Sequence, residues 1–200
     1  MVPVQQEVVV TVTRAEPTRR LPRVQRRQQI LGAATRAFAR AGFTNTSLEA
    51  IAAEAAVTPV ILYRHFASKA DLYREVLDNG YTRLRQATGA DDFDDGSIPA
   101  LISAAAADPD AFRLLFRYAA REPEFRDVIE ALSEGWTEIT RRHLAVIDDM
   151  RWQSWAARLL PTLTTEAVIA WLDAGQPDPD QAASRIRHLI DAVLAAGHSQ

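Results

Sequence analysis

Residues 46–69 read TSLEAIAAEAAVTPVILYRHFASK, a stretch that predicts two short helices separated by a tight turn. The first helix opens on Thr46, which forms a capping box pattern with Glu49, and it carries an apolar face. The second begins with Thr58 as N-cap and Pro59 at the first helical position, where the missing N–H of proline costs nothing. Two helices with these proportions indicate a helix-turn-helix.

The segment before this stretch predicts a further helix. Its apolar residues recur at helical spacing from Ile30 to Ala41. We expect Gly42 to end that helix in a left-handed conformation and Phe43 to fold back onto Phe38. A fourth helix is expected from Ser68 towards Tyr81. The head of the protein, residues 23–83, is thus predicted to hold three helices at 24–41, 46–55 and 58–66, followed by this fourth one.

The third helix indicates what the head binds. Leu62 and Phe66 are one turn apart and are expected to face the core, which points Val60 and Arg64 away from it. Ile61 and Tyr63 lie on the flanks. A free-standing domain gains nothing by displaying such apolar and aromatic groups to water. A helix that enters the DNA major groove would use them.

The same region carries motifs that coincide in spacing with those of one known family. They are Arg26-Arg27, Ile30-Leu31, Ala33-Ala34, Phe38, Gly42-Phe43, Thr46-Ser47-Leu48, Ile51-Ala52, Ala55-Ala56-Val57, Leu62-Tyr63-Arg64-His65-Phe66, Ser68-Lys69 and Leu72. With them, residues 26–77 resemble the DNA-binding domain of the TetR (tetracycline repressor) family. The rest of the chain resembles the family only in helix number and in phrases such as residues 121–125.

The resemblance implies a role in DNA binding for eleven residues. Phosphate contacts are expected from Arg26 (or its neighbour Arg27), Thr46, Ser47, Tyr63, His65 and Lys69. Base contacts are expected at the end of the third helix that enters the groove, from Thr58, Pro59, Val60, Ile61 and Arg64. The structural alternative is helix capping for the threonines and plain solvation for the charged groups.

Two departures from the family pattern carry hypotheses of their own. Val60 and Ile61 are bulky and apolar where small or polar residues are common, so we expect them to contact thymine methyl groups. Ala56 stands where glycine is usual in the turn. If this position is left-handed, alanine costs roughly 1–2 kcal/mol.

Charge divides the chain into a basic and an acidic part. Residues 1–89 hold 13 Arg+Lys against 7 Asp+Glu, whereas the remainder holds 10 against 19. Residues 1–22 are interpreted as a flexible basic arm that would reach an adjacent minor groove. Residues 84–97 are interpreted as an acidic linker, because the spacing of their aspartates does not match a calcium-binding loop.

Residues 98–197 continue as helices, one of them at roughly 152–172 with an interruption at Pro161. The predicted fold class is therefore all-α, with a C-terminal helical bundle for effector binding and dimerisation. An apolar, aromatic pocket for a small hydrophobic or aromatic effector is expected to be lined by Phe112, Phe116, Trp136, Ile139, His143, Trp155 and Thr162. Homodimer contacts through the last two helices are expected from Val168, Trp171, Ile186, Leu189, Ile190 and Val193. Each residue has the alternative of belonging to the core of its own chain.

Several protein classes are excluded or disfavoured. The chain has no cysteine, which excludes disulfides and thiolate metal sites and indicates the cytoplasm. No apolar run approaches the roughly 20 residues of a membrane span, and the N-terminus lacks the pattern of a signal peptide. The four histidines are scattered and no catalytic constellation is visible, so no enzyme, cofactor or metal site is expected.

The predicted function is that of a one-component transcription regulator, a ligand-relieved repressor that binds a palindromic operator as a homodimer. The alternative is a helical binding module whose basic head contacts an acidic protein or a membrane surface.

Overall fold

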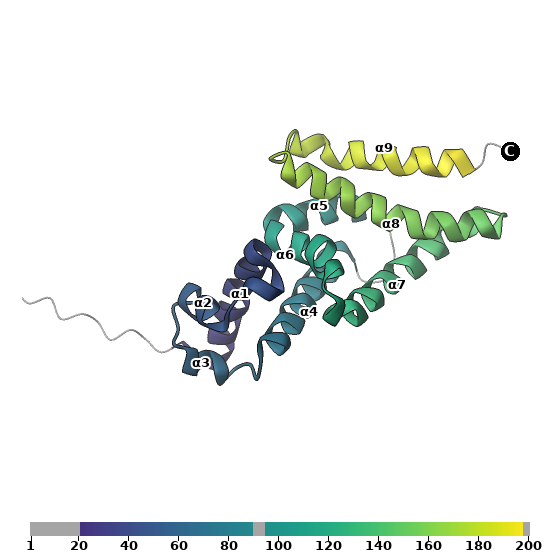
Figure 1. Ribbon diagram of the computed structural model, residues 1–200. Coiled ribbons are helices and arrows are strands. Elements are labelled where there is room, and N and C mark those ends of the chain that lie inside the picture. The colour runs from purple at the N-terminus through teal and green to yellow at the C-terminus, as the bar shows by residue number, and fades with distance from the viewer. Residues whose placement is uncertain (1–20, 90–94, 198–200) are drawn as a thin grey trace, which may run out of the picture.

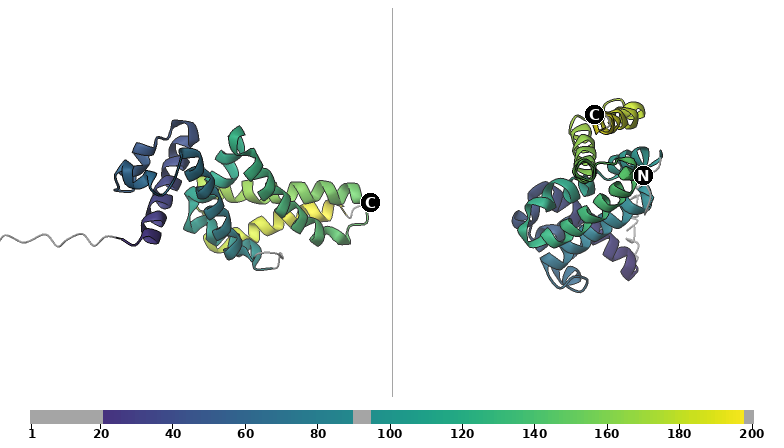
Figure 2. Two further views of the ribbon diagram at one scale, coloured as in Figure 1. Left: turned by 90° about the horizontal axis from the view of Figure 1, so that it is seen from below. Right: turned by 90° about the vertical axis from the view of Figure 1, so that its right-hand side faces the viewer.

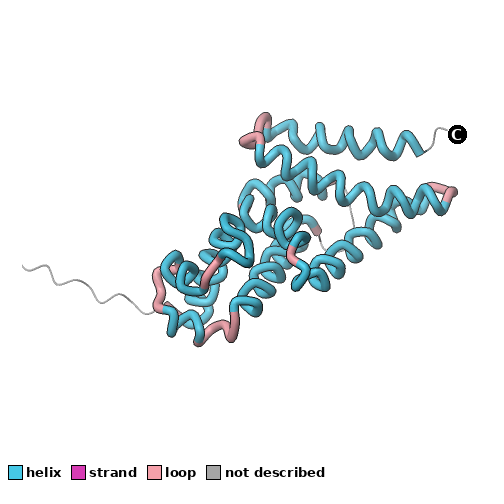
Figure 3. The backbone as a smooth tube through the Cα atoms, viewed as in Figure 1, coloured by secondary structure: helices cyan, strands magenta, loops and turns pink. Residues whose placement is uncertain are grey.

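The computed structural model describes residues 21–89 and 95–197, and within these ranges the chain is helical and contains no strand (Figures 1 and 3). The helices of the head are α1 (Arg23–Asn45), α2 (Leu48–Glu54), α3 (Pro59–Tyr63) and α4 (Lys69–Thr88). Those of the body are α5 (Ser97–Ala107), α6 (Pro109–Arg113), the π-helix η1 (Leu114–Tyr118), the 3-10 turns η2 (Ala119–Arg121), η3 (Pro123–Phe125) and η4 (Leu144–Val146), and α7 (Arg126–His143), α8 (Met150–Asp173) and α9 (Pro179–Gly197). The all-α prediction is confirmed.

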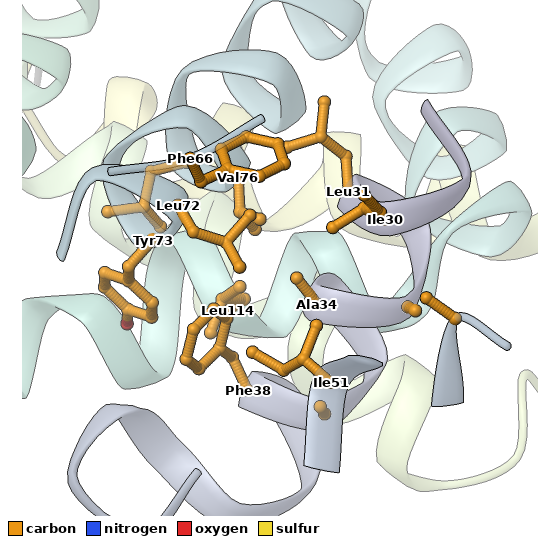
Figure 4. Close-up of a cluster of buried hydrophobic side chains, with 14 of the residues drawn as sticks. Ile30, Leu31, Ala34, Phe38, Ile51, Phe66, Leu72, Tyr73, Val76 and Leu114 are labelled. Carbon is orange, nitrogen blue, oxygen red and sulfur yellow. The ribbon is translucent and has the colours of Figure 1, made fainter. Parts of the chain in front are cut away.

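The head packs α2 and α3 against α1 and α4 around one apolar core. Figure 4 shows Phe38 and Ala34 of α1, Ile51 of α2, and Leu72 of α4 directed into this core. The helix starts follow from side-chain caps: Ser47, Thr58 and Ser68 accept backbone N–H groups of α2, α3 and α4. Gly42 has the predicted positive φ, 75°, but it bends α1 rather than ending it, and the Phe43 ring centroid lies 6.2 Å from that of Phe38.

The body is built on α8 and α9, which run antiparallel and side by side (Figures 1 and 2). Helices α5 and α7 pack beside them and close a second apolar core. Between the two cores, Phe125 of η3 is fully buried in the head core rather than in that of the body. Its ring lies against Phe43 of α1 and Tyr73 of α4, with centroid distances of 4.8 and 4.4 Å. Head and body therefore share packed aromatic surface.

Two further expectations about helix limits are wrong. Helix α8 was predicted to be interrupted at Pro161, but it continues through this residue. A proline removes one backbone hydrogen bond, whereas Leu160, Thr164 and Val168 of the same helix are buried on the side that faces the rest of the body, and that packing outweighs the loss. The linker was predicted at 84–97, yet α4 extends to Thr88, because Leu84 is buried against the body core.

Two expected segments lie mostly or partly outside the described residues. The basic arm at 1–22 is described only from residue 21 onwards, and Arg23 already belongs to α1. Of the acidic linker, residues 90–94 are outside the described ranges.

Candidate functional site

Helix α3 divides into a buried and an exposed face. Leu62 has no exposed surface and Phe66, just beyond the helix, is also buried, as predicted. On the opposite side, 62% of Val60 and 52% of Tyr63 are exposed, and Arg64 is exposed with them. Ile61 between them is half-buried, so it is less accessible than the sequence suggested. A five-residue helix thus presents an apolar, aromatic and cationic surface to solvent.

The start of α3 is set by the turn that precedes it. Thr58 and Pro59 are both exposed, and the Thr58 hydroxyl accepts the backbone N–H of Ile61 at 3.4 Å. Ala56 in the turn has a φ of 50°, which is the left-handed conformation suspected from the sequence. The turn is tied to α1 by Gln29, whose side-chain amide donates to the Ala55 carbonyl at 2.7 Å.

Thr46 was predicted to cap the second helix and to contact phosphate, and the structure contradicts its role as the cap. It follows α1 rather than capping α2, and it is buried. Its hydroxyl donates to the Gly42 carbonyl at 2.6 Å and also lies 3.3 Å from the Ala37 carbonyl, which leaves it facing the protein interior. The bend at Gly42 is the cause, because it exposes carbonyls of α1 that need a donor. Ser47 takes over as the N-cap and accepts the N–H of Ala50 at 3.0 Å.

Ser47, Tyr63 and Lys69 are brought together by the fold. They line one shallow surface hollow between the end of α1 and the start of α2, and Tyr63 closes it from α3. The ammonium of Lys69 donates to the Phe43 and Thr44 carbonyls at 2.9 and 3.4 Å and stands 4.4 Å from the centre of the Phe43 ring. A cation at a helix C-terminus is electrostatically favoured, so Lys69 is held in place before any ligand arrives.

His65 lies close to the first turns of α1, which carry Arg26. His65 is half-buried, and its Nδ1 atom is buried without a hydrogen-bond partner among the described residues. Desolvation lowers the pKa of His65 below its ordinary value, and the positive charges of Arg23, Arg27 and Arg26 lower this pKa further. Arg26 itself donates to the side-chain oxygen of Gln29 at 2.9 Å. Three arginines of α1 therefore lie close enough to disfavour a positive charge on the imidazole.

The body contains an apolar cavity of about 260 Å³ between the end of α4 and helices α5, α7, α8 and α9. Its apolar wall includes Leu101, Trp136, Leu160, Pro161, Ile190 and Leu194. The hydroxyls of Thr140 and Thr164 also face this region, but they donate to carbonyls of their own helices, each at 2.8 Å. Within the described lining, the charged side chains are Asp191 and Arg187, both from α9. Arg187 also donates to Asp95 at 2.6 Å. Such a lining fits an apolar molecule with a polar end.

The predicted pocket residues do not all meet at this cavity. Trp136 and His143 line it. Phe116 and Thr162 line a smaller cavity of about 100 Å³, for which Trp136 and Pro161 form a shared wall. Phe112 lines a separate hollow beside α4. Ile139 is not part of the main lining, and its carbonyl accepts a hydrogen bond from Nδ1 of His143 at 2.9 Å.

Trp155 was predicted to line the pocket, but its side chain lies on the surface of the protein. It is 49% exposed and stacks on Trp152 with 4.6 Å between ring centroids. The helical period places it on the outer face of α8, opposite the buried residues Ala157 and Thr164. The interpretation of Trp155 as a pocket residue is therefore wrong.

Comparison with known proteins decides the family. The profile described as "Bacterial regulatory proteins, tetR family" matches residues 30–76. The transcriptional activator FasR of Mycolicibacterium smegmatis is 30% identical over 181 residues, which cover 82% of this chain and 80% of FasR. The chain belongs to the TetR family. Its fold agrees with this: a TetR-like regulator from Rhodococcus sp. RHA1 superposes with a TM-score of 0.75 at 24% identity, covering 88% of this chain and 99% of the other.

A second solved structure extends the likeness of fold. NalD of Pseudomonas aeruginosa, described as the secondary repressor of the MexAB-OprM multidrug efflux pump, has a TM-score of 0.64 at 23% identity and covers 86% of this chain and 98% of its own. TetR-family proteins are DNA-binding transcription regulators rather than enzymes, and they usually bind operator DNA as homodimers. Among the described residues of this TetR-family chain, no helix has the length and apolarity needed to cross a membrane.

Three of the six residues predicted to form the dimer interface are instead buried within their own chain. Val168, Trp171 and Ile186 are buried within the chain's own body core, and the Trp171 indole N–H donates to the Pro177 carbonyl at 2.8 Å. Their apolar surface packs against α5 and the end of α4, which sequence periodicity cannot reveal. Leu189 is 49% exposed, whereas Ile190 and Val193 are half-buried. Only the Leu189 side of α9 remains as the exposed part of the predicted interface.

Sequence reasoning also missed residues at both sites. At the cavity it missed the walls from α5 and the end of α4, because the packing order of the helices is not written in their periodicity. In the head it grouped Arg27 with Arg26 as a residue near the DNA backbone. The structure instead pairs Arg27 with Glu75 of α4, 48 residues away, and the conspicuous Arg26-Arg27 pair was the only available signal.

Proposed function

We propose that this protein is a cytoplasmic, ligand-responsive transcription regulator that binds a palindromic operator as a homodimer, with α3 in the major groove. One observation carries the proposal. Helix α3 buries Leu62 while it holds Val60, Tyr63 and Arg64 in solvent, beside the hollow of Ser47 and Lys69. A surface that reads bases next to one that holds phosphates is the arrangement a major-groove binder needs.

The hollow supports the phosphate part of the proposal. A lysine ammonium has three N–H donors, so Lys69 can keep its carbonyl contacts and still bind an oxyanion. The hydroxyls of Ser47 and Tyr63 supply neutral donors on two other sides. Because one short helix reads few base pairs, specificity requires two heads, which favours a twofold dimer on a palindrome. The exposed Leu189 side of α9 is the proposed dimer surface.

The main cavity supports ligand control. Its apolar lining favours a hydrophobic or aromatic effector. Helix α7 supplies Trp136 to this cavity and begins directly after Phe125, which is buried in the head. An effector that prefers the arrangement with poorly spaced heads would lower operator affinity, with a coupling of about 1–3 kcal/mol. Repression relieved by this ligand is the proposed outcome.

Activation is the second candidate, because FasR, the 30% identical relative, is named an activator. A reporter gene placed behind the protein's binding site separates the two. Expression that rises when the gene for the regulator is deleted supports repression, and expression that falls supports activation.

The central experiment is selection of bound fragments from the source genome, followed by titration of the enriched duplex and a scrambled duplex at several salt concentrations. We expect the enriched duplex to bind roughly 10³-fold or more tightly, with both affinities falling as salt rises. Tyr63→Ala is expected to weaken binding, whereas Glu130→Ala on α7 provides a control outside the head. Equal affinity for both duplexes would instead support a head that binds polyanionic surfaces in general. Screening apolar compounds for release of the enriched duplex then tests ligand control.

A further inference from the structure

Arg27 is the most completely engaged cation of the head. Its Nε donates to Oε1 of Glu75 at 2.7 Å and its Nη2 donates to Oε2 of the same carboxylate, so the pair is bidentate. Its Nη1 donates to the backbone carbonyl of His65 at 2.8 Å. The guanidinium carbon stands 4.5 Å above the centre of the Phe66 ring. One side chain thus joins α1, α4 and the segment that follows α3.

The His65 carbonyl, to which Arg27 donates, lies in a weakly stabilised part of the head. Helix α3 has five residues, and a helix of this length is not stable by itself. Its N-terminal end is held by the Thr58 cap and its middle by the burial of Leu62. Carbonyls at a helix C-terminus lack intrahelical partners, and the His65 carbonyl lies just beyond that end.

The contact also stands close to the exposed face of α3. Tyr63 and Arg64 immediately precede His65 in the chain. Movement of the His65 peptide group would therefore change where these two side chains point. The planar guanidinium is suited to this task, because its donors are fixed in direction and can serve a carboxylate and a carbonyl at once.

We propose that Arg27 and Glu75 form a clamp that positions the C-terminal end of α3 for DNA, and that Arg27 does not itself bind phosphate. The proposal rests on the proposed function, in that α3 is the element that reads DNA. In the clamp, Glu75 is required for binding even though it carries a negative charge near a polyanion.

The clamp can be tested with the full-length protein, because it and simple electrostatics predict opposite effects of a Glu75 substitution on DNA affinity. The probe is the duplex that the wild-type protein enriches from a random-sequence library, compared with a scrambled duplex of equal length. Glu75→Gln removes a negative charge, so electrostatics alone predicts tighter binding. The clamp predicts weaker binding, by about tenfold for the loss of one charge-assisted contact. Arg27→Lys keeps the charge but cannot serve both acceptors, and it is expected to weaken binding by a similar factor.

The salt dependence separates positioning from phosphate contact. Loss of one phosphate contact lowers the slope of log affinity against log salt by about 0.9. We expect Arg27→Ala to leave this slope unchanged and to reduce the preference for the enriched duplex over the scrambled one. Arg26→Ala, at a predicted phosphate contact, is expected to lower the slope. Arg36→Ala is the matched control, because Arg36 of α1 also pairs with an acid, Glu54 of α2, at 2.9 Å and away from α3.

A purely structural role for Arg27 would lower the active fraction of protein without changing the dissociation constant, so both are measured in each titration. The clamp is overturned if Glu75→Gln binds more tightly, if Arg27→Lys binds as the wild type does, or if Arg27→Ala lowers the slope by about one unit. Failure of the wild-type protein to enrich any duplex would overturn the proposed function, and the clamp with it.

Discussion

The ring of Phe125 lies 4.4 Å from the ring of Tyr73, centroid to centroid, so that a residue of the body is packed inside the head. The two residues are 52 positions apart in the chain. Tyr73 has no exposed surface and also makes an edge contact with Phe38 at 4.8 Å. Head and body are therefore expected to unfold together.

Phe125→Ala tests this shared packing. Removal of a fully buried phenylalanine is expected to destabilise the protein by about 3–5 kcal/mol, and chemical denaturation is the measurement. Phe125→Leu keeps most of the volume and is expected to cost less than about 1.5 kcal/mol. A loss below about 1 kcal/mol for the alanine variant would contradict the burial of this ring in the head.

Tyr73→Phe is expected to act in the opposite direction. Burial raises the pKa of the Tyr73 phenol above its ordinary value, and its hydroxyl has no hydrogen-bond partner among the described residues. A buried polar group without a partner costs about 1–3 kcal/mol. Removing the hydroxyl is therefore predicted to leave the free energy of unfolding equal or raised by about 1 kcal/mol. Tyr63→Phe, at an exposed ring, is the control that should show no change.

Ala56→Gly addresses the strained turn of the helix-turn-helix. With φ at 50°, alanine carries a penalty of roughly 1–2 kcal/mol that glycine does not. Allowing for the greater chain entropy of unfolded glycine, we expect a net gain of about 1 kcal/mol, or a rise in Tm of about 2–4 °C. Ala53→Gly, inside α2, is the matched control and should lower Tm. If the Tm of the wild type equals or exceeds that of Ala56→Gly, the backbone at Ala56 is not strained.

The lowered pKa of His65 predicts a pH dependence. Because the folded state disfavours the protonated imidazole, unfolding takes up a proton between the lowered pKa of the folded state and the unfolded pKa of about 6.5. Stability is therefore complete above this pH and falls as the pH drops below it. Denaturation of the wild type and of His65→Gln between pH 8 and pH 5 gives the contribution of His65 as a difference. Parallel curves for the two proteins would show that the imidazole is not perturbed.

Val60→Ala tests base reading by apolar contact. Since Val60 is mostly exposed, its truncation is expected to change stability by less than about 0.5 kcal/mol. It should reduce the preference for thymine at one operator position, because the contact to a methyl group is lost, while the salt dependence stays the same. Selection from a randomised operator library, done in parallel with Ile61→Ala, measures this preference. Identical base preferences for Val60→Ala and wild type would refute the contact.

Local sequence determined most of the head. The capping roles of Thr58 and Ser68, the positive φ at Gly42 and the buried face of Leu62 and Phe66 were all predictable. Each depends on hydrogen bonds within a few residues or on the helical period, so the information lies close by in the chain. For Ala56 the family pattern raised a left-handed turn only as a condition, and the φ of 50° meets that condition.

Contacts between distant segments were decided by the tertiary structure alone. Ser47, not Thr46, is the N-cap of α2, because the bend at Gly42 directs carbonyl groups towards the Thr46 hydroxyl. The packing of α1 against α4 places Arg27 beside Glu75. Trp171 is buried in its own chain by α5 and α9, and not by a second subunit. Helical periodicity says which face of a helix is buried but not which helix covers it. That choice depends on the summed packing of the whole chain, which is why the cavity, the clamp and the exposed side of α9 became visible only in the fold.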